Sequence, residues 1–193
     1  MIYHWWLDRK TNNGYAYANN IFSLEELDSI TKIGLDQSLS SVEKPLVGQN
    51  SDSDYRICET SFIRSDISSN QWIFMRLTDV ITEINKQYFN FDLDYIQNLQ
   101  FTSYPIGGHY GRHTDLANAA ERPRKLSFVL QLSDIDDYDD GELKIYYSDE
   151  PYTAQKTKGT LTVFPSYALH EVTPITKGTR YSLVGWVCGP CFK

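Results

Sequence analysis

Apolar residues recur at helical spacing twice in the first half of the chain. The segment Ser23-Leu24-Glu25-Glu26 has the capping-box pattern, and apolar residues follow at i, i+3 spacing as far as Ile33, which predicts a helix over about 24–37. A second helix is predicted to begin after Ser69-Asn70, where a single apolar stripe starts. Its members are Ile73, Leu77, Val80, Ile81, Ile84 and Tyr88. The polar stretch between these helices, Ser38–Asp54, is predicted to be an irregular loop.

From about Tyr95 the pattern changes to short runs rich in β-formers, separated by turn clusters such as Asp139-Asp140-Gly141. Helices followed by closely spaced strands indicate an α+β protein whose C-terminal part is a two-sheet sandwich or jelly roll. The predicted strands are Ile96–Tyr104, Leu126–Leu132, Leu143–Tyr147, Thr160–Phe164, Ala168–Thr173 and Arg180–Val187.

Length and charge narrow the classes of function. The 193 residues predict one domain, with helical support over about 1–94 and a jelly-roll core over about 95–190. A net charge of −7 disfavours nucleic acid as a partner, and no apolar run approaches the length of about 18 residues that a membrane helix needs. Charges appear by Asp8, too early for a signal peptide, so we expect a cytoplasmic protein (in the host cytoplasm if a virus encodes it). Oligomeric state is left open.

The three cysteines, Cys58, Cys188 and Cys191, are an odd set and predict no disulfide framework. Cys188-Gly189-Pro190-Cys191 has the four letters of the thioredoxin redox motif, in which a following helix lowers the pKa of the first thiol. Only Phe192 and Lys193 follow here, so no helix can form behind the motif. We therefore interpret these cysteines as incidental.

His113-Thr114-Asp115 is a candidate metal-binding pair. On a strand, residues i and i+2 point to the same face, so both side chains can converge on one ion. Imidazoles with one carboxylate suit an Fe(II) site that keeps positions open for substrate and O₂. The third ligand is then another histidine, and His170 on a predicted strand is the natural candidate, whereas His109 is expected to be solvated or hydrogen-bonded.

An arginine follows the candidate ligand His170 in the sequence. Arg180 lies ten positions after His170, and Ser182 shares its strand face at i+2. A buried arginine can bind a carboxylate through two hydrogen bonds, as a metal-chelating dicarboxylate co-substrate requires at its far end. The alternative is a surface ion pair in an acidic protein.

At this point the sequence resembles the Fe(II)/2-oxoglutarate dioxygenases, specifically the prolyl 4-hydroxylase-like branch. Tyr104–Asp115 matches the Tyr-x₂-Gly-x₂-Tyr-x₂-His-x-Asp pattern of that branch, and the likeness continues in the same order over about 95–190. The further matching segments are Leu126–Asp134, Asp136–Leu143, Phe164–Ser166, His170–Pro174 and Gly178–Ser182. The resemblance implies a double-stranded β-helix (jelly roll) with the N-terminal helices packed against one sheet.

The resemblance also implies roles for the candidate residues. His113, Asp115 and His170 would hold Fe(II), and Arg180 would pair with the C5 carboxylate of 2-oxoglutarate, helped by Ser182. Family halogenases replace the carboxylate ligand by a small residue, so Asp115 favours hydroxylation. The implied reaction uses O₂ and releases succinate and CO₂, with ascorbate as reductant.

Further positions match residues that surround the co-substrate in relatives. Tyr104 matches a tyrosine whose hydroxyl faces 2-oxoglutarate, and Leu143 and Val172 match residues that line its methylenes. Each is alternatively an ordinary core residue. Gln131 departs from the family, because relatives often carry a tyrosine there that reaches 2-oxoglutarate, so the contact made by Gln131 is left open. Tyr110 is expected to be a packing residue.

Two positions match the substrate side. Trp186 resembles the tryptophan that walls the pocket, and Arg124 matches an arginine that contacts peptide in several prolyl hydroxylases. Alternatively they are a core tryptophan and an exposed arginine. Dealkylases of the superfamily usually carry a second arginine where Trp186 stands, which argues against a nucleic-acid dealkylase.

The hypothesis is therefore a hydroxylase of prolyl residues, at C4, in a peptide or protein, with the loop Ser38–Asp54 closing over the substrate. One alternative is a 2-oxoglutarate-dependent hydroxylase of a free amino acid or other small molecule. A second is a non-catalytic jelly-roll module that kept a metal site.

Overall fold

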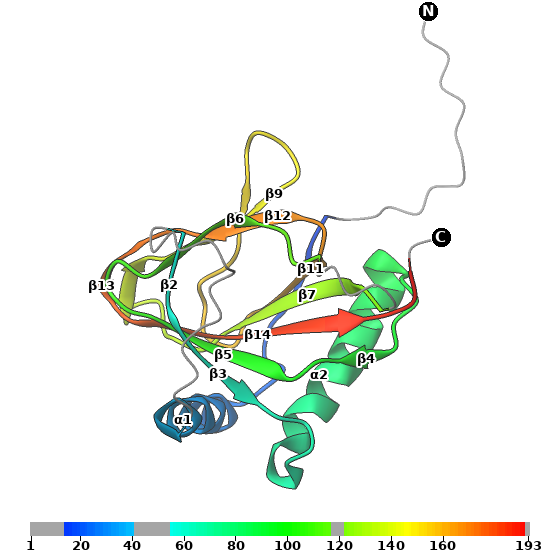
Figure 1. The fold of residues 1–193 in the computed structure, drawn as a ribbon, viewed down its shortest axis with the longest axis horizontal. Coiled ribbons are helices and arrows are strands. Elements are labelled where there is room, and N and C mark those ends of the chain that lie inside the picture. Colours follow the sequence, from blue (N-terminus) through cyan, green and yellow to red (C-terminus); the bar gives the residue numbers. More distant parts are fainter. Residues whose placement is uncertain (1–13, 41–54, 117–121, 192–193) are drawn as a thin grey trace, which may run out of the picture.

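Two β-sheets face each other in the computed structural model, which describes residues 14–40, 55–116 and 122–191 (Figure 1). Within these residues the larger sheet has seven strands, and all of its pairs are antiparallel. In order across the sheet they are β1 (Ala16–Ala18), β11 (Leu161–Pro165), β7 (Arg124–Gln131), β14 (Arg180–Cys188), β5 (Leu99–Tyr104) and β3 (Glu59–Ile63), with β4 (Tyr95–Ile96) also paired to β14.

The smaller sheet has the order β10 (Tyr152–Thr153), β9 (Leu143–Tyr146), β12 (Leu169–Val172), β6 (His109–His113) and β2 (Arg56–Ile57). A separate pair joins β13 (Ile175–Gly178) to β8 (Tyr138–Asp140). Along the chain the strands alternate between the two sheets: β5, β7, β11 and β14 lie in the larger one, and β6, β9 and β12 lie in the smaller one. This alternation is that of a jelly roll, and it confirms the predicted α+β fold.

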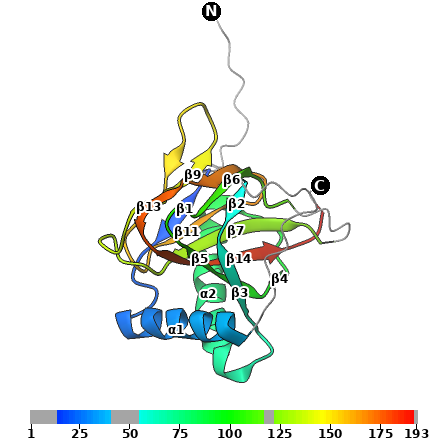
Figure 2. The same cartoon turned by 60° about the vertical axis from the view of Figure 1, so that its left-hand side comes forward.

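Both long helices cover the outer face of the larger sheet (Figure 2). In α1 (Leu24–Ser40) the capping box is formed, since the Glu26 amide donates to Ser23 Oγ and the Ser23 amide donates to the Glu26 carboxylate. The buried residues Leu27 and Ile30 share one core cluster with the apolar stripe of α2 (Gln71–Ile84), which follows the turn η1 (Ser68–Asn70) and continues into the π-helix η2 (Asn85–Phe89). The predicted packing of the helices against one sheet is confirmed.

Two helix predictions need correction. Helix α1 continues to Ser40, so positions 38–40 of the predicted loop are helical, because no proline or glycine occurs there to end the helix before Pro45. The rest of that loop, 41–54, lies outside the described residues. Leu24 is 64% exposed rather than part of the buried stripe, because it begins the helix ahead of the turn that meets the sheet.

The longer predicted strands are confirmed within a few residues at each end, but several short strands are not evident from sequence. Strands β1, β2, β3, β6, β8, β10 and β13 have two to five residues, too few for a periodic pattern to stand out. Strand β6 also ends at His113, so the expectation that His113 and Asp115 share one strand is wrong, and Asp115 lies two residues beyond its end.

None of the three cysteines forms a disulfide in the part of the chain that the structure describes. Strand β14 runs to the buried Cys188, and no helix follows it up to Cys191. Within the described residues, the Cys-x-x-Cys segment is thus not at the start of a helix of the kind that activates a redox thiol. Among the described residues no helix combines the length and apolar character that a membrane crossing needs.

A glycine sets the approach to the start of β14. Gly178 has φ +73°, and a Cβ there would lie 2.0 Å from the Asp137 carbonyl oxygen. Only glycine fits this turn without strain. The turn brings the chain from β13 into the larger sheet, where Arg180 is the first residue of β14 and faces Tyr104 of β5.

Candidate active site

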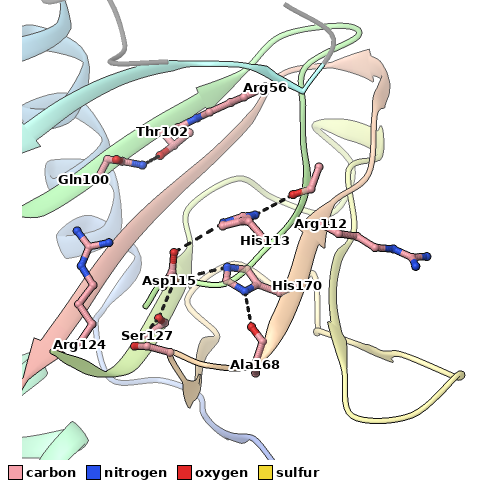
Figure 3. Close-up of polar contacts among 12 residues, drawn as sticks. Arg56, Gln100, Thr102, Arg112, His113, Asp115, Arg124, Ser127, Ala168 and His170 are labelled. Carbon is pink, nitrogen blue, oxygen red and sulfur yellow. Dashed lines mark hydrogen bonds and ion pairs between the residues drawn. The ribbon is translucent and has the colours of Figure 1, made fainter. Parts of the chain in front are cut away.

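Three side chains predicted as metal ligands converge between the sheets (Figure 3). His113 ends β6 and His170 lies on the neighbouring strand β12, where the two residues are Cα partners. Asp115 follows β6, and a hydrogen bond from its amide to the Ser166 carbonyl, 2.9 Å long, holds its backbone. His113 is half-buried, and Asp115 and His170 are buried.

The potential ligand atoms of these residues lie within 4.8 Å of one another. His113 Nε2 is 3.7 Å from Asp115 Oδ1, and His170 Nε2 is 3.4 Å from Asp115 Oδ2. Two imidazole nitrogens and one carboxylate oxygen on one side of an ion form the two-histidine, one-carboxylate set that suits non-haem Fe(II). This arrangement leaves the remaining coordination positions to other ligands.

Hydrogen bonds fix both imidazoles in the form that binds metal. Nδ1–H of His113 donates to the Gly111 carbonyl at 2.8 Å, and Nδ1–H of His170 donates to the Ala168 carbonyl at 2.9 Å. Each Nε2 therefore keeps its lone pair for an ion. Burial, and then the neighbouring His170, lower the pKa of His113 to about 4, so this imidazole is neutral at pH 7.

Two serines orient the carboxylate of Asp115, and sequence reasoning missed both. Ser127 Oγ donates to Asp115 Oδ2 at 2.7 Å and lies 3.0 Å from Ser166 Oγ. Both serines are fully buried. Ser127 belongs to β7 of the larger sheet, so it reaches Asp115 across the space between the sheets, which no local sequence pattern indicates.

Replacing Ser127 by alanine is expected to weaken metal affinity by about 10- to 100-fold, the usual effect of losing a hydrogen bond that orients a metal ligand. Titration of the apoprotein with Fe(II) or Mn(II) under nitrogen measures the change. Ser29→Ala on α1, whose hydroxyl bonds only the Glu25 carbonyl, is the matched control. Unchanged affinity in Ser127→Ala would show that Asp115 needs no such support.

The triad opens into a cavity of about 220 Å³ between the sheets. All the predicted site residues except Gln131 line it, together with five that were not predicted to bind a ligand. The lining residues are Arg56, Gln100, Tyr104, Tyr110, His113, Asp115, Arg124, Val129, Leu143, His170, Val172, Arg180, Ser182, Val184 and Trp186.

Arg180 and Ser182 form the polar end of this cavity. Both are buried on β14, and the Arg180 guanidinium lies 5.5 Å from the Tyr104 ring. Burial raises the pKa of Tyr104 far above its ordinary value, so its hydroxyl stays protonated. Ser182 Oγ is buried without a hydrogen-bond partner. A buried guanidinium beside an unpartnered hydroxyl is suited to bind a carboxylate.

Gln131 does not line the cavity around the triad. Its side-chain amide donates to the Tyr138 hydroxyl at 2.9 Å and to the Ser133 carbonyl at 3.3 Å. The Arg180 guanidinium is close enough to the same Tyr138 hydroxyl to oppose the rise that burial causes in its pKa. The contact left open for Gln131 is thus with Tyr138, which lies between Gln131 and the guanidinium. Tyr138, almost fully buried on β8, was missed from sequence.

Tyr138→Phe is expected to raise the KM for 2-oxoglutarate about 3- to 30-fold, because the polar hydroxyl beside the Arg180 guanidinium is lost, while kcat changes little. Steady-state succinate formation measures both constants. Tyr146→Phe, which removes a hydroxyl bonded to Glu171 outside the cavity, is the control. Equal KM values in Tyr138→Phe and the parent would contradict a positioning role.

Trp186 and Arg124 meet at the other side of the cavity, as the substrate-side prediction requires. The Arg124 guanidinium lies 3.8 Å from the Trp186 ring, and its Nε donates to Gln97 Oε1 at 3.1 Å. Tyr110, expected only to pack, stacks on His113 with ring centroids 3.6 Å apart and lines the cavity. His109, on the same strand as His113, instead contacts the Gly107 carbonyl through Nδ1 and is not part of the triad.

Fold and site together define a jelly-roll protein with a histidine–aspartate–histidine metal site. The ligand atoms of this triad suit iron(II), and the lining of the cavity suits a dicarboxylate co-substrate. The unpartnered buried atoms of the structure support this fit. Within the described residues, the buried side-chain polar atoms that have no partner are Arg56 Nη2, Ser182 Oγ and Trp186 Nε1, and all three belong to lining residues of this one cavity. Polar atoms left unpaired in a buried site are expected where a ligand completes them.

Comparison with known proteins agrees with this class. Residues 99–188 match the family model described as the 2OG-Fe(II) oxygenase superfamily. A PKHD-type hydroxylase of Picosynechococcus is 41% identical over 92 residues, which cover 48% of this chain and 42% of that protein. A PKHD-type hydroxylase of Maricaulis maris is 38% identical over 92 residues, which again cover 48% of this chain and 42% of that protein. The chain thus spans less than half the length of these curated relatives.

Solved structures share the fold over most of the chain. A prolyl-4-hydroxylase of Pseudomonas putida superposes with a TM-score of 0.73 at 20% identity, covering 92% of this chain and 94% of the other. A prolyl hydroxylase of Trichoplax adhaerens, solved with a hypoxia-inducible-factor peptide fragment, gives 0.75 at 21% identity, covering 91% and 83%.

Residues 99–188 are therefore similar to the 2OG-Fe(II) oxygenase superfamily, and the solved structures that share the fold include prolyl 4-hydroxylases. The name of that superfamily implies Fe(II) and 2-oxoglutarate, and the triad of His113, Asp115 and His170 is the candidate site for the iron.

Proposed function

We propose that this protein hydroxylates prolyl residues, at C4, of a peptide or protein, using Fe(II), 2-oxoglutarate and O₂, with ascorbate keeping the iron reduced. The family match supports the reaction class. The observation that supports a peptide as the substrate is a second hollow beside the cavity. This flanking groove, of about 640 Å³, shares Gln100, Arg124 and Trp186 with the cavity.

The flanking groove suits a chain that continues beyond the reacting residue. Its other lining residues come from strand ends and turns beside β3, β4 and β5, and they offer both amides and apolar surface. They are Phe62, Ser65, Tyr95, Ile96, Gln97 and Asn98. A free amino acid fits within the cavity alone and gains nothing from such a groove. A peptide places its reactive ring at Trp186 and its flank in the groove.

The roles of the residues follow from their positions. His113, Asp115 and His170 hold the iron, which with 2-oxoglutarate supplies O₂ activation, oxidative decarboxylation to succinate and CO₂, and insertion of one oxygen atom into a substrate C–H bond. Arg180 and Ser182 bind the far carboxylate of the co-substrate and so orient it.

The remaining side chains shape and dry the site. Tyr104, protonated, offers a hydroxyl to the co-substrate, while Leu143 and Val172 exclude water along its methylenes. Trp186 is 8% exposed and bounds the space where the substrate lies. A closed apolar wall favours transfer of oxygen to the substrate over loss to solvent.

The test is incubation of the protein with Fe(II), 2-oxoglutarate, ascorbate and a broad library of proline peptides, followed by mass spectrometry. We expect products heavier by one oxygen atom, 4-hydroxyproline after hydrolysis, and turnover that increases from free proline to longer peptides. His170→Ala serves as the inactive control. Absence of any oxygenated product would overturn the proline assignment, and faster turnover of free proline would favour a small-molecule hydroxylase.

A further inference from the structure

Two arginines that line the cavity have no carboxylate partner among the described residues. Arg56 reaches the cavity from β2 and Arg124 reaches it from β7 (Figure 3). Neither takes part in an ion pair in the described parts of the chain, although the protein as a whole carries a net charge of −7. In an acidic protein, two unpaired guanidinium groups in one cavity need a physical explanation.

Among the described residues, no anion contacts the Arg56 side chain. Its Nε donates to Cys58 Sγ at 2.9 Å, its guanidinium lies 4.5 Å from the Tyr110 ring, and its Nη2 is buried with no partner. Burial raises the pKa of the Cys58 thiol, so the sulfur is neutral at pH 7 and does not balance the charge. A buried donor left without a partner costs free energy that a ligand can recover.

The printed contacts of Arg124 within the described residues are likewise with neutral groups. It bonds the amide oxygen of Gln97 and lies over the Trp186 ring. Trp186 adds a third donor, because its Nε1 is buried without a partner while the side chain is 92% buried. A site with three unsatisfied or weakly satisfied donors, two of them cationic, is complementary to an acceptor that carries negative charge.

The other charged groups that line the cavity do not neutralise Arg56 and Arg124. Asp115 supplies the one carboxylate among the lining residues, and it is a metal ligand. Asp115, Fe(II) and doubly charged 2-oxoglutarate together leave one negative charge in excess, which Arg180 balances. Counting the described residues, Arg56 and Arg124 therefore remain as two positive charges that no carboxylate balances, and burying unpaired charge is unfavourable.

We propose that the substrate carries a carboxylate close to the carbon that is hydroxylated, bound by Arg56 and Arg124. This inference rests on the proposed hydroxylase function and specifies its substrate class. The carboxylate has two chemical sources: an Asp or Glu side chain beside the target residue of a peptide, or the α-carboxylate of a free amino acid.

Calorimetric binding to the Fe(II)- and 2-oxoglutarate-loaded protein under nitrogen tests the proposal without turnover. One pair of probes is acetyl-Ala-Asp-Pro-Asp-Ala-amide and its Asn-for-Asp counterpart, and the other is L-proline and L-prolinamide. We expect the acidic member of at least one pair to bind tenfold or more tightly. The pair that shows the preference identifies the source of the carboxylate.

Variants assign the preference to the two arginines. In the double variant Arg56→Gln, Arg124→Gln the preference is expected to fall below threefold, whereas the lysine double variant keeps part of it. Arg112→Gln is the matched control, because Arg112 points away from the cavity toward Glu171 and Tyr146 (Figure 3). Unchanged binding of 2-oxoglutarate in the glutamine variant would show that it remains folded.

Equal or undetectable binding of the acidic and amide probes would overturn the proposal, as would a preference that survives in the glutamine double variant. The proposed hydroxylase function fails by a different measurement, namely absence of oxygenated product in air. A charge preference in binding without any product would therefore support the carboxylate site and reject proline as its target.

Discussion

Replacing His170 by alanine removes succinate formation and lowers Fe(II) affinity by more than about 100-fold, beyond the effect of losing a residue that merely supports a ligand. The reason is geometric. His170 Nε2 and His113 Nε2 both face Asp115, and with one imidazole gone only two ligand atoms remain on the ion. Metal content after dialysis and succinate release from 2-oxoglutarate are the two measurements.

His109→Ala is the matched control for this variant. His109 lies on the same strand as His113 but contacts the Gly107 carbonyl, so its loss leaves iron content and turnover close to the parent values. Retention of stoichiometric iron by His170→Ala would contradict the assigned ligand set. Circular dichroism separates loss of iron from loss of fold.

Replacing Arg180 by alanine weakens 2-oxoglutarate binding by about 30-fold to several thousandfold, the equivalent of roughly 2–5 kcal/mol for truncating one partner of a buried charged pair. The side chain is 3% exposed at the end of the cavity, with Ser182 beside it. Water cannot substitute for a guanidinium in so enclosed a place. Calorimetric titration of the metal-loaded protein with 2-oxoglutarate under nitrogen measures the loss.

The same variant separates an oxygenase from a module that only binds metal. Iron content is expected to stay at the parent value in Arg180→Ala, because Arg180 is not a ligand. Lys177→Ala, an exposed position three residues earlier, is the control for charge loss. Parent-like 2-oxoglutarate affinity in Arg180→Ala would favour the non-catalytic module.

Much of the fold and of the candidate site was predictable, because the residues involved are close together in the sequence or alternate along one strand. The capping box at Ser23 and the apolar stripe of α2 depend on residues three or four positions apart, so periodicity finds them. Strand β14 carries Arg180, Ser182 and Trp186, which are separated by two and by four residues. Because side chains alternate between the faces of a strand, all three lie on one face. The motif around His113 and Asp115 supplied the rest by family likeness.

The missed residues share a different property. Ser127 reaches Asp115 from the opposite sheet, Tyr138 reaches Arg180 from a strand of three residues, and Arg56 lies on a strand of two. Their neighbours along the chain carry no signal of these contacts. Each contact depends on how distant strands pair and how the two sheets face each other.

The sequence by itself determined the order of the two helices and the longer strands, and with the family resemblance it singled out His113, Asp115, His170 and Arg180 as candidate site residues, since helix and strand periods and motif spacing are local properties. Only the tertiary structure decided that His113 and His170 are partners across β6 and β12 and that Tyr138 intervenes between Gln131 and the guanidinium. It also decided that two arginines line the cavity without a carboxylate partner among the described residues. These features depend on strand register and burial. Both arise from contacts between residues far apart in the chain, because the removal of apolar surface from water fixes how the strands and sheets pack.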